Sequence, residues 1–206
     1  MNRGCLTVII GPMFSEKSGE LIRRCQKLIQ YGRKKVYAYK PAEDNRFARE
    51  DIVSRIGYTL PASSISCELT SEVTAAILAE TENIDVIAFD EAQFFTWPII
   101  ELVEQLVYRG KHVIIAGLNT DYRGKPFGHI GDLLAMADEI VKLTAFCACC
   151  SDPNATFTQR TINGRPAALG PLILIGDTES YEPRCRSCYV SPQQVAERIT
   201  ATPSIV

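Results

Sequence analysis

The fold is decided by residues 5–21, CLTVIIGPMFSEKSGEL. The run CLTVII (5–10) is apolar and rich in β-branched side chains, which predicts a short buried strand. A polar stretch follows Gly11, and apolar residues then recur at helical spacing until Gly32, which predicts an amphipathic helix. A loop between a strand and a helix directs backbone N–H groups to a point where phosphate oxygens bind. The segment therefore suggests a phosphate-binding loop in an α/β protein.

This loop departs at one position from the phosphate-loop pattern G-x-x-x-x-G-K-[ST]. Gly11, Lys17 and Ser18 fit the pattern, but Glu16 stands where it has the second glycine. On this motif alone, a nucleotide loop and an ordinary turn before a helix remain equally open. A carboxylate ~4 Å from a phosphate charge would add repulsion of roughly 4 kcal/mol at an effective dielectric near 20. We expect Glu16 to weaken ATP binding unless it turns to solvent or to Arg23, or occupies the helix N-terminus until ATP displaces it.

Strand and helix patterns alternate through the next part of the chain, with residues 42–66 expected to be loop apart from a short strand near 51–56. Such alternation favours a parallel sheet with helices on both faces, whose ligands bind beyond the carboxyl ends of the strands. The predicted strands are KKVYAYK (34–40), IDVIAFDE (84–91) and KHVIIAGL (111–118), and the predicted helices are SEVTAAILAE (71–80), capped by Thr70 or Ser71, WPIIELVEQLVYRG (97–110), with Pro98 in its first turn, and SPQQVAERI (191–199).

Two acids, Asp90 and Glu91, end the predicted strand VIAF and emerge at the carboxyl edge of the same sheet. In phosphate-loop enzymes a magnesium-binding acid and a catalytic acid are found at such a place. An Asp–Glu pair is also common as a solvated strand end, but its occurrence together with the loop favours phosphoryl transfer. Glu91 would then activate either water, as in an ATPase, or a substrate hydroxyl, as in a small-molecule kinase.

The chain has eight cysteines, and four of them form two C-x-x-C pairs, Cys147 with Cys150 and Cys185 with Cys188. Four thiolates in such pairs predict a structural zinc site, with Cys149 as a spare. A redox role is the weaker alternative because neither pair opens a helix in a strand–helix unit. The C-terminal part is too short for a core of its own and needs such a staple, so we place a domain boundary near Thr144.

The segment between the two cysteine pairs, residues 151–184, is too long for an ordinary zinc ribbon. Loops of this length are usually functional or disordered. With both ends held by zinc, the segment would fold over a ligand as a lid, and LGPLILIGDTESY (169–181) would supply apolar backbone to a pocket. The alternative is an additional β-hairpin packed on the main sheet.

Composition excludes some classes of partner. The 206 residues carry 22 basic and 24 acidic side chains, a net charge of -2, without long runs of either sign. We therefore expect no nucleic-acid partner and no anionic membrane partner. Neither a bilayer-spanning apolar stretch nor a secretory signal is recognisable, so we expect a cytoplasmic protein with reduced thiols.

Seven motifs, in their order and spacing, resemble those of the type II thymidine kinases, the family of cytosolic, zinc-containing deoxynucleoside kinases. The resemblance runs over nearly the whole chain. The motifs are GPMFSEKS (11–18), KPAEDNR (40–46), FDEAQFF (89–95), GLNTDYRGKPFG (117–128), TAFCACC (144–150), TFTQR (156–160) and YEPRCRSC (181–188).

The resemblance implies a RecA-like fold of the phosphate-loop NTPases, with an ATP-binding α/β domain at residues 1–143. Residues 144–206 would form a small zinc-binding domain with a lasso loop that covers the substrate. The implied reaction is transfer of the γ-phosphoryl group of ATP to the 5'-hydroxyl of thymidine, the salvage synthesis of dTMP for DNA synthesis. It also implies a homotetramer that is inhibited by dTTP.

The resemblance also implies roles for individual residues. Glu91 corresponds to the general base, Ser18 and Asp90 to the magnesium-binding residues, and Asp44 with Arg46 to the pair near the 5'-oxygen and the transferred phosphate. The implied ATP-binding residues are Gly11, Pro12, Met13, Phe14, Ser15, Glu16, Lys17, Ser18, Asp90 and Gln93. The implied substrate-binding residues are Met13, Phe94, Leu118, Tyr122, Phe127, Thr158, Leu172, Ile173, Leu174, Ile175, Gly176 and Tyr181, and those from Leu172 to Tyr181 belong to the lasso.

Three residues depart from the family's pattern: Tyr122 stands at a usual phenylalanine, Asn119 at a usual aspartate, and Glu16 at the loop glycine. Two alternative functions therefore accompany the active kinase. One is a noncatalytic or weakly active homologue whose ATP binding is impaired by Glu16. The other, a recombinase-type ATPase acting on DNA, fits less well because the chain has no basic stripe to hold a phosphate backbone.

Overall fold

The computed structural model describes residues 3–42, 51–172 and 181–200 of the 206. The chain divides into two compact units. The first consists of Met1–Ile10, Glu16–Asn119 and Phe127–Leu143. The second consists of Gly11–Ser15, Thr120–Pro126 and Thr144–Val206.

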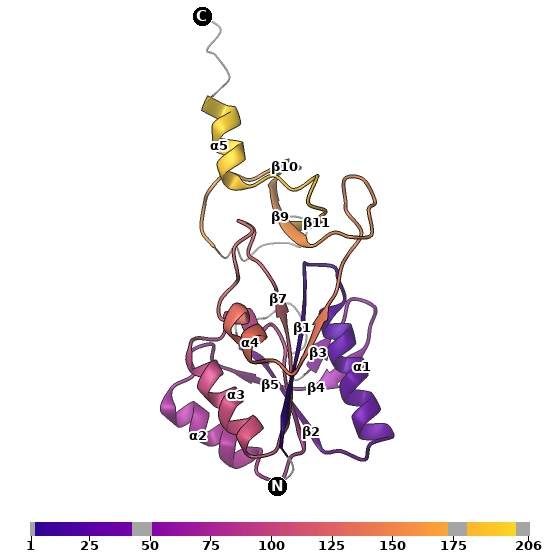
Figure 1. Ribbon diagram of the computed structural model, residues 1–206, viewed down its shortest axis with the longest axis vertical. Coiled ribbons are helices and arrows are strands. Elements are labelled where there is room, and N and C mark those ends of the chain that lie inside the picture. Colours follow the sequence, from indigo (N-terminus) through magenta and orange to yellow (C-terminus); the bar gives the residue numbers. More distant parts are fainter. Residues whose placement is uncertain (1–2, 43–50, 173–180, 201–206) are drawn as a thin grey trace, which may run out of the picture. The chain divides into compact units, whose positions relative to one another are not determined.

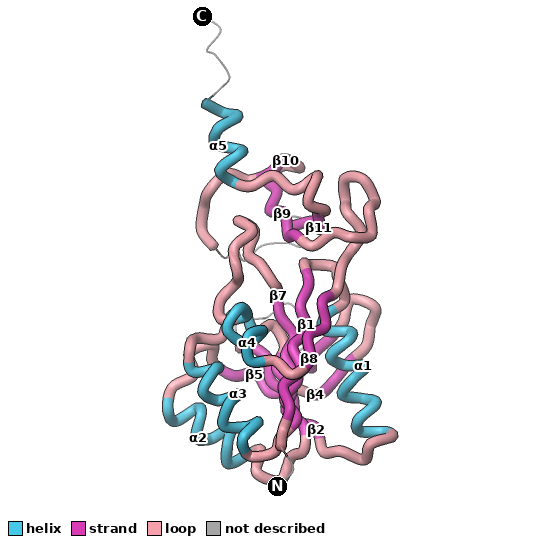
Figure 2. The backbone as a smooth tube through the Cα atoms, in the orientation of Figure 1, coloured by secondary structure: helices cyan, strands magenta, loops and turns pink. Residues whose placement is uncertain are grey.

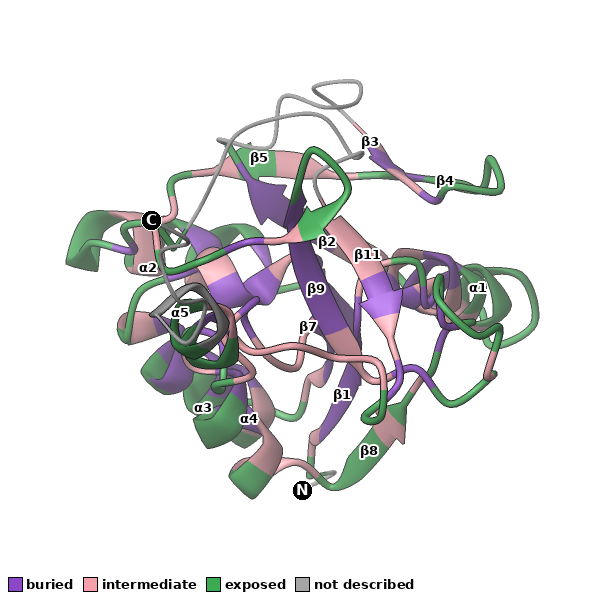
Figure 3. Ribbon diagram, turned by 90° about the horizontal axis from the view of Figure 1, so that it is seen from above, coloured by how far each residue is buried: buried purple, intermediate pink, exposed green. Residues whose placement is uncertain are grey.

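The first unit is built on a six-stranded sheet in the order β5-β2-β6-β7-β1-β8. The pairs β1–β8, β2–β5, β2–β6 and β6–β7 are parallel, as the sequence predicted. The central strands are buried and the outer surfaces of the helices are exposed (Figure 3). The strands are β1 (Cys5–Gly11), β2 (Val36–Pro41), β5 (Ser63–Ile65), β6 (Val86–Phe89), β7 (His112–Leu118) and β8 (Glu139–Lys142).

Helices cover both faces of this sheet, which confirms the predicted α/β class (Figure 1). Helix α1 (Lys17–Gln30) packs on one face, and α2 (Ser71–Glu80), α3 (Pro98–Tyr108) and α4 (Ile130–Met136) lie on the other. Side chains of β1 alternate between the two cores: Val8 and Ile10 join the cluster under α3, and Ile9 joins the cluster under α1. This alternation is how a central parallel strand is buried on both faces.

Local signals set the helix boundaries where the sequence predicted them. Thr70 caps α2, since its Oγ1 accepts a hydrogen bond of 3.4 Å from the Val73 N–H. Pro98 is the first residue of α3, where its missing N–H costs no helical hydrogen bond. Gly110 follows the end of α3 with a positive φ of 82°, which a residue with a Cβ adopts only at a cost.

The interpretation of residues 42–66 as mostly loop was incomplete. Strand β3 (Asp51–Val53) confirms the short strand predicted near 51–56, but β4 (Thr59–Pro61) and β5 were not predicted. Strands β3 and β4 form an antiparallel pair, and β5 joins the edge of the main sheet. Strands β4 and β5 have only three residues each, too few for an alternating pattern to be recognised.

The second unit contains a separate three-stranded sheet in the order β10-β9-β11 (Figure 2). Strand β9 (Phe157–Ile162) lies in the centre and pairs antiparallel with both β10 (Arg165–Pro166) and β11 (Tyr181–Arg184). The last helix is α5 (Pro192–Thr200), which confirms the predicted C-terminal helix. In the described ranges, no helix is long and apolar enough to cross a membrane.

Candidate active site and metal centre

Helix α1 of the first unit is preceded by a left-handed residue, Glu16, at φ 59° and ψ 35°. A residue with a Cβ pays roughly 1–2 kcal/mol for this conformation, whereas glycine adopts it freely. The phosphate-loop pattern has its second glycine here, and the backbone of this chain has kept the shape that suits glycine. Glu16 therefore places a strained backbone at the start of the helix.

The Glu16 side chain lies against the first turn of α1, close to Gly19. Its Oε2 lies 2.8 Å from the point where a Cβ would stand on Gly19. This oxygen is buried, and it finds no hydrogen-bond partner within the described part of the chain. The suggested pairing with Arg23 was wrong, because the Arg23 guanidinium donates to Glu20 at 2.7 Å, one turn closer along the helix. Of the suggested positions, the helix N-terminus is the one that the structure favours.

Lys17, Asp90 and Glu91 form a cluster of charged groups between α1 and the carboxyl end of β6. Asp90 is 6% exposed and Lys17 is 8% exposed. Burial, and next the neighbouring Glu91 carboxylate, raise the pKa of Asp90 to about 7. Burial lowers the pKa of Lys17, while the charges of Glu91 and Asp90 act in the opposite direction. Lys17 therefore compensates part of the negative charge of the two acids, and the acids in turn compensate the buried charge of Lys17.

The Ser18 hydroxyl is hydrogen-bonded to the Asp90 carboxylate, so the serine and the acid predicted to share a magnesium ion are neighbours. A carboxylate and a hydroxyl offer the oxygen ligands that Mg²⁺ prefers. Two adjacent acids, of which one is buried, also favour a bound cation. This donor set fits magnesium, and Lys17 beside it suits a phosphate group.

Glu91 itself has a left-handed backbone, with φ 49° and ψ 39°, and precedes the short 3-10 helix η1 (Ala92–Phe94). Non-glycine residues in this region cost free energy and cluster at functional sites. Gln93 of η1 donates from Nε2 to the Glu91 carboxylate, and its Oε1 accepts from the Leu118 N–H at 2.9 Å. The strand-end acid is thus held by the element that follows it.

The predicted substrate-binding residues of the first unit are Phe94, Leu118 and Phe127. The rings of Phe94 and Phe127 meet edge to face, with centroids 5.6 Å apart. Leu118 ends β7 and is joined to η1 through Gln93. The structure therefore brings these three residues together around η1.

In the second unit, the Met13 N–H donates to Thr158 Oγ1 at 3.1 Å, so two predicted substrate-binding residues are in contact. Ser15 of the same loop donates from its hydroxyl to the Pro12 carbonyl at 2.8 Å. These bonds fix the first half of the loop to its own backbone and to β9.

Tyr122 uses the hydroxyl that distinguishes it from phenylalanine. The hydroxyl donates to the Gly170 carbonyl at 2.8 Å and accepts from the Gly170 N–H at 3.0 Å. The guanidinium groups of Arg160 and Arg123 lie 5.0 and 5.4 Å from the centre of its ring. Burial raises the pKa of Tyr122, but the hydrogen bonds with Arg123 and Gly170 outweigh it, so the net pKa is lowered. Tyr122 therefore joins its loop to the start of the predicted lasso.

Several predicted residues fall elsewhere. Leu172 is 39% exposed, and Tyr181 pairs in register with Arg160 between β11 and β9. Asp44, Arg46, Ile173, Leu174, Ile175 and Gly176 lie outside the described residues.

Two residues of the second unit were missed by the sequence interpretation. Arg160 is only 4% exposed, and its Nη1 donates to the Pro171 carbonyl at 2.7 Å. A buried arginine is rare without partners, and a lone charged residue at the end of TFTQR was the available signal. Tyr189, directly after the last cysteine, donates from its hydroxyl to the Tyr122 carbonyl at 2.8 Å and stacks on Phe157.

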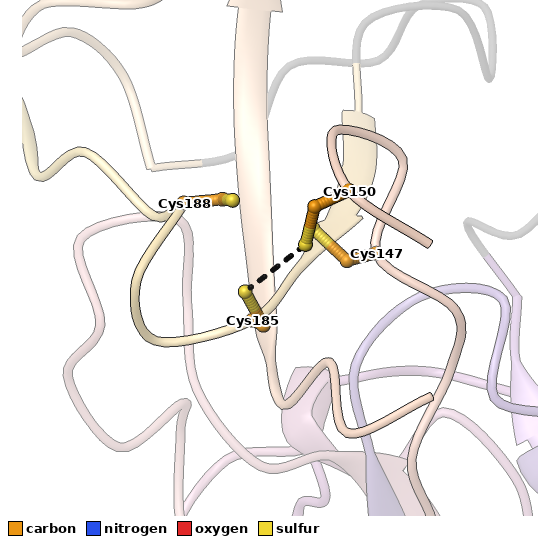
Figure 4. A group of neighbouring side chains, drawn as sticks. All are labelled: Cys147, Cys150, Cys185 and Cys188. Carbon is orange, nitrogen blue, oxygen red and sulfur yellow. Dashed lines mark hydrogen bonds between the residues drawn. The ribbon is translucent and has the colours of Figure 1, made fainter. Parts of the chain in front are cut away.

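The four paired cysteines converge, as Figure 4 shows for the side chains of Cys147, Cys150, Cys185 and Cys188. Their sulfur atoms lie within 4.8 Å of one another, and those of Cys150 and Cys185 are 3.7 Å apart. Sulfur atoms around a tetrahedral zinc ion with bonds of ~2.3 Å would be about 3.8 Å apart. Burial acts against ionisation of Cys147, but backbone hydrogen bonds from Cys185, Cys149 and Cys150 hold its pKa at about 6. The predicted cluster is confirmed as a group that could hold a metal such as zinc.

The fold and these residues define an α/β protein with a parallel sheet, an acid pair at a strand end beside a helix N-terminus, and a four-cysteine cluster. A family model described as thymidine kinase matches residues 4–189. The chain belongs to the thymidine kinase family.

Solved structures offer more distant likenesses. Domain III of the Thermotoga maritima replication initiation protein DnaA is 13% identical, with a TM-score of 0.41, over 69% of this chain and 55% of that one. The genome packaging NTPase B204 of Sulfolobus turreted icosahedral virus 2, in complex with sulfate, is 19% identical, with a TM-score of 0.44, over 69% and 74%. The chain thus spans about half the length of the first structure.

Proposed function

We propose that this chain is an active thymidine kinase that transfers the γ-phosphoryl group of ATP to the 5'-hydroxyl of thymidine. The observation that carries the proposal is the cluster of Lys17, Asp90 and Glu91 in a chain of the thymidine kinase family. A noncatalytic chain has no need to keep two acids and a buried lysine in one cluster, because such a cluster costs desolvation free energy.

In the proposed reaction, Glu91 accepts the proton of the 5'-hydroxyl, the oxygen attacks the γ-phosphorus, and the bond to the β-phosphate oxygen breaks to release ADP. Lys17 contacts the outer phosphates, and Ser18 with Asp90 would hold magnesium. Bound there, the ion would neutralise phosphate charge. Asp44 and Arg46 are proposed to act near the reacting oxygen, where a positive group offsets developing charge.

The remaining proposals concern binding and assembly. The loop 11–18 and Gln93 are proposed to serve ATP binding, and the substrate pocket and lasso to bind the thymine base. We divide the chain into an ATP-binding domain, residues 1–143, and a lasso domain, residues 144–206. Zinc at the four cysteines would stabilise the lasso domain. A cytoplasmic homotetramer with feedback inhibition by dTTP remains our expectation.

A phosphoryl-transfer assay tests the proposal. Release of ADP is measured with thymidine, deoxyuridine, deoxycytidine and without acceptor. We expect release that depends on thymidine. Release that needs no acceptor would indicate an ATPase instead. No release at millimolar ATP would favour the noncatalytic homologue. This second candidate is supported by the strained backbone of Glu16 and by its buried Oε2, which is unpaired among the described residues.

Replacement of Glu16 by glycine is expected to lower the dissociation constant of Mg-ATP about tenfold. Glycine removes a negative charge from the helix N-terminus, where a phosphate is favoured. It also relieves backbone strain of roughly 1–2 kcal/mol, which is present without ATP and therefore adds to the stability of the fold. Isothermal titration calorimetry measures the change. Glu16→Gln is the matched variant because it removes the charge and keeps the strain. Unchanged ATP affinity in both variants would show that Glu16 lies clear of the phosphates.

A further inference from the structure

The side chain of Gln93 is bonded at both ends between the strand-end acid and the end of β7. We propose that Gln93 is a positioning residue, which fixes the orientation of the Glu91 carboxylate for proton transfer. This inference rests on the proposed function and goes beyond the ATP-binding role expected for Gln93. All contacts that carry it lie in the first unit.

The two hydrogen bonds leave one orientation for the Gln93 amide. The Leu118 N–H can only donate, so the atom facing it, at 2.9 Å, must be the amide oxygen. The amide nitrogen then faces the Glu91 Oε2 and donates to it. A backbone group of β7 thus determines that a donor, and never an acceptor, is presented to the acid.

Close packing holds Gln93 in this position, where it is 3% exposed. A Cβ on Gly117 would stand 2.9 Å from the Gln93 Oε1 and 2.7 Å from a methyl group of Ile130. A Cβ on Gly128 would stand 2.2 Å from the Gln93 carbonyl oxygen, so the loop before α4 also closes directly on this residue. Gly117 thus leaves the space for the Gln93 amide oxygen, and Gly128 lets the loop approach the Gln93 backbone closely.

Such a support matters because Glu91 has a costly left-handed backbone. A strained residue keeps its conformation only if its surroundings over-determine it. Lys17 and Asp90 act on Glu91 through charge, which has little directional preference. The Gln93 amide adds direction, because its N–H donates along one line to the Oε2 of Glu91.

Two substitutions separate the contact with Glu91 from the contact with Leu118. Gln93→Met has a similar length and makes neither hydrogen bond. Gln93→Glu keeps an acceptor for the Leu118 N–H and, when ionised, loses the donor to Glu91. The same changes at Gln105, exposed on α3, are the matched controls.

We expect Gln93→Met and Gln93→Glu each to lower kcat about 100-fold, the usual effect of a misplaced reacting group. The dissociation constant and KM of thymidine should change less than about threefold, since only an interaction of the transition state is removed. In the Glu91→Gln background, adding Gln93→Met should lower the residual rate less than about twofold, because the carboxylate that Gln93 positions is gone.

The outcomes are distinguishable. Suppose that the wild-type enzyme phosphorylates thymidine and that the kcat of Gln93→Glu lies within about twofold of the wild-type kcat. This result would overturn the inference and leave the proposed function intact. A parallel fall of kcat and thymidine affinity would also overturn it, because Gln93 would then support only the fold. No ADP release by the wild-type chain with any acceptor would overturn both.

Discussion

Replacement of Glu91 by glutamine is expected to lower kcat for thymidine phosphorylation about 1,000-fold, within the range that general base catalysis contributes. The substitution keeps the size of the side chain but removes its ability to take the proton of the 5'-hydroxyl. It also removes the neighbouring negative charge that raises the pKa of Asp90. Folding should therefore be unaffected or slightly improved.

The measurement combines rapid-quench kinetics with calorimetry. Thymidine affinity is expected to stay within about threefold of the wild type, because the acid acts only in the transition state. Glu101→Gln, at an exposed position in the first turn of α3, is the control for loss of an acidic charge. Turnover within about tenfold of the wild type in Glu91→Gln would show that another group takes the proton.

The main sheet and its helices could be predicted because their signals are local and long. Strand β1 is a continuous apolar run, and α3 has both a proline at its start and a glycine after its end. The position of Asp90 and Glu91 also follows from the chain, since residues directly after a parallel strand emerge at its carboxyl edge. The cysteine cluster was predictable because two C-x-x-C pairs can be recognised directly in the sequence, and this spacing is typical of zinc ligands.

What could not be predicted depends on contacts between distant residues or on competition between partners. Glu20 precedes Arg23 by three residues, so the two side chains lie on the same side of α1, whereas Glu16 lies a further turn away. Arg23 therefore forms its ion pair with Glu20. The bond from Gln93 to Leu118 spans 25 positions, and no pattern in the sequence reports it. The same holds for Arg160, whose partner Pro171 and neighbouring ring of Tyr122 come together only in the folded second unit.

Removal of the metal is expected to unfold the sheet of the second unit and to abolish thymidine-dependent turnover. Among the described residues, the hydrophobic cluster beside the cysteines has Ala145, Ala155, Cys147 and Cys185 as its buried members, with Cys188 packed on it. Two methyl side chains bury too little area to order a segment of this length. Zinc bound by four thiolates contributes ~10–16 kcal/mol to folding in small domains at neutral pH, which can offset that deficit.

Metal analysis should therefore find one zinc ion per chain, the number that a four-cysteine site holds. Hydrogen exchange then follows the amides of β9 and β11 before and after chelation. Cys185→Ser removes one ligand and should lose both the ion and the protection, whereas Cys149→Ser, which changes an exposed cysteine outside the cluster, should keep both. Protection of β9 and β11 that survives in the metal-free protein would mean that the pairing of the strands suffices alone, with four residue pairs between β9 and β11 and two between β9 and β10. The small buried core of this unit argues against that result.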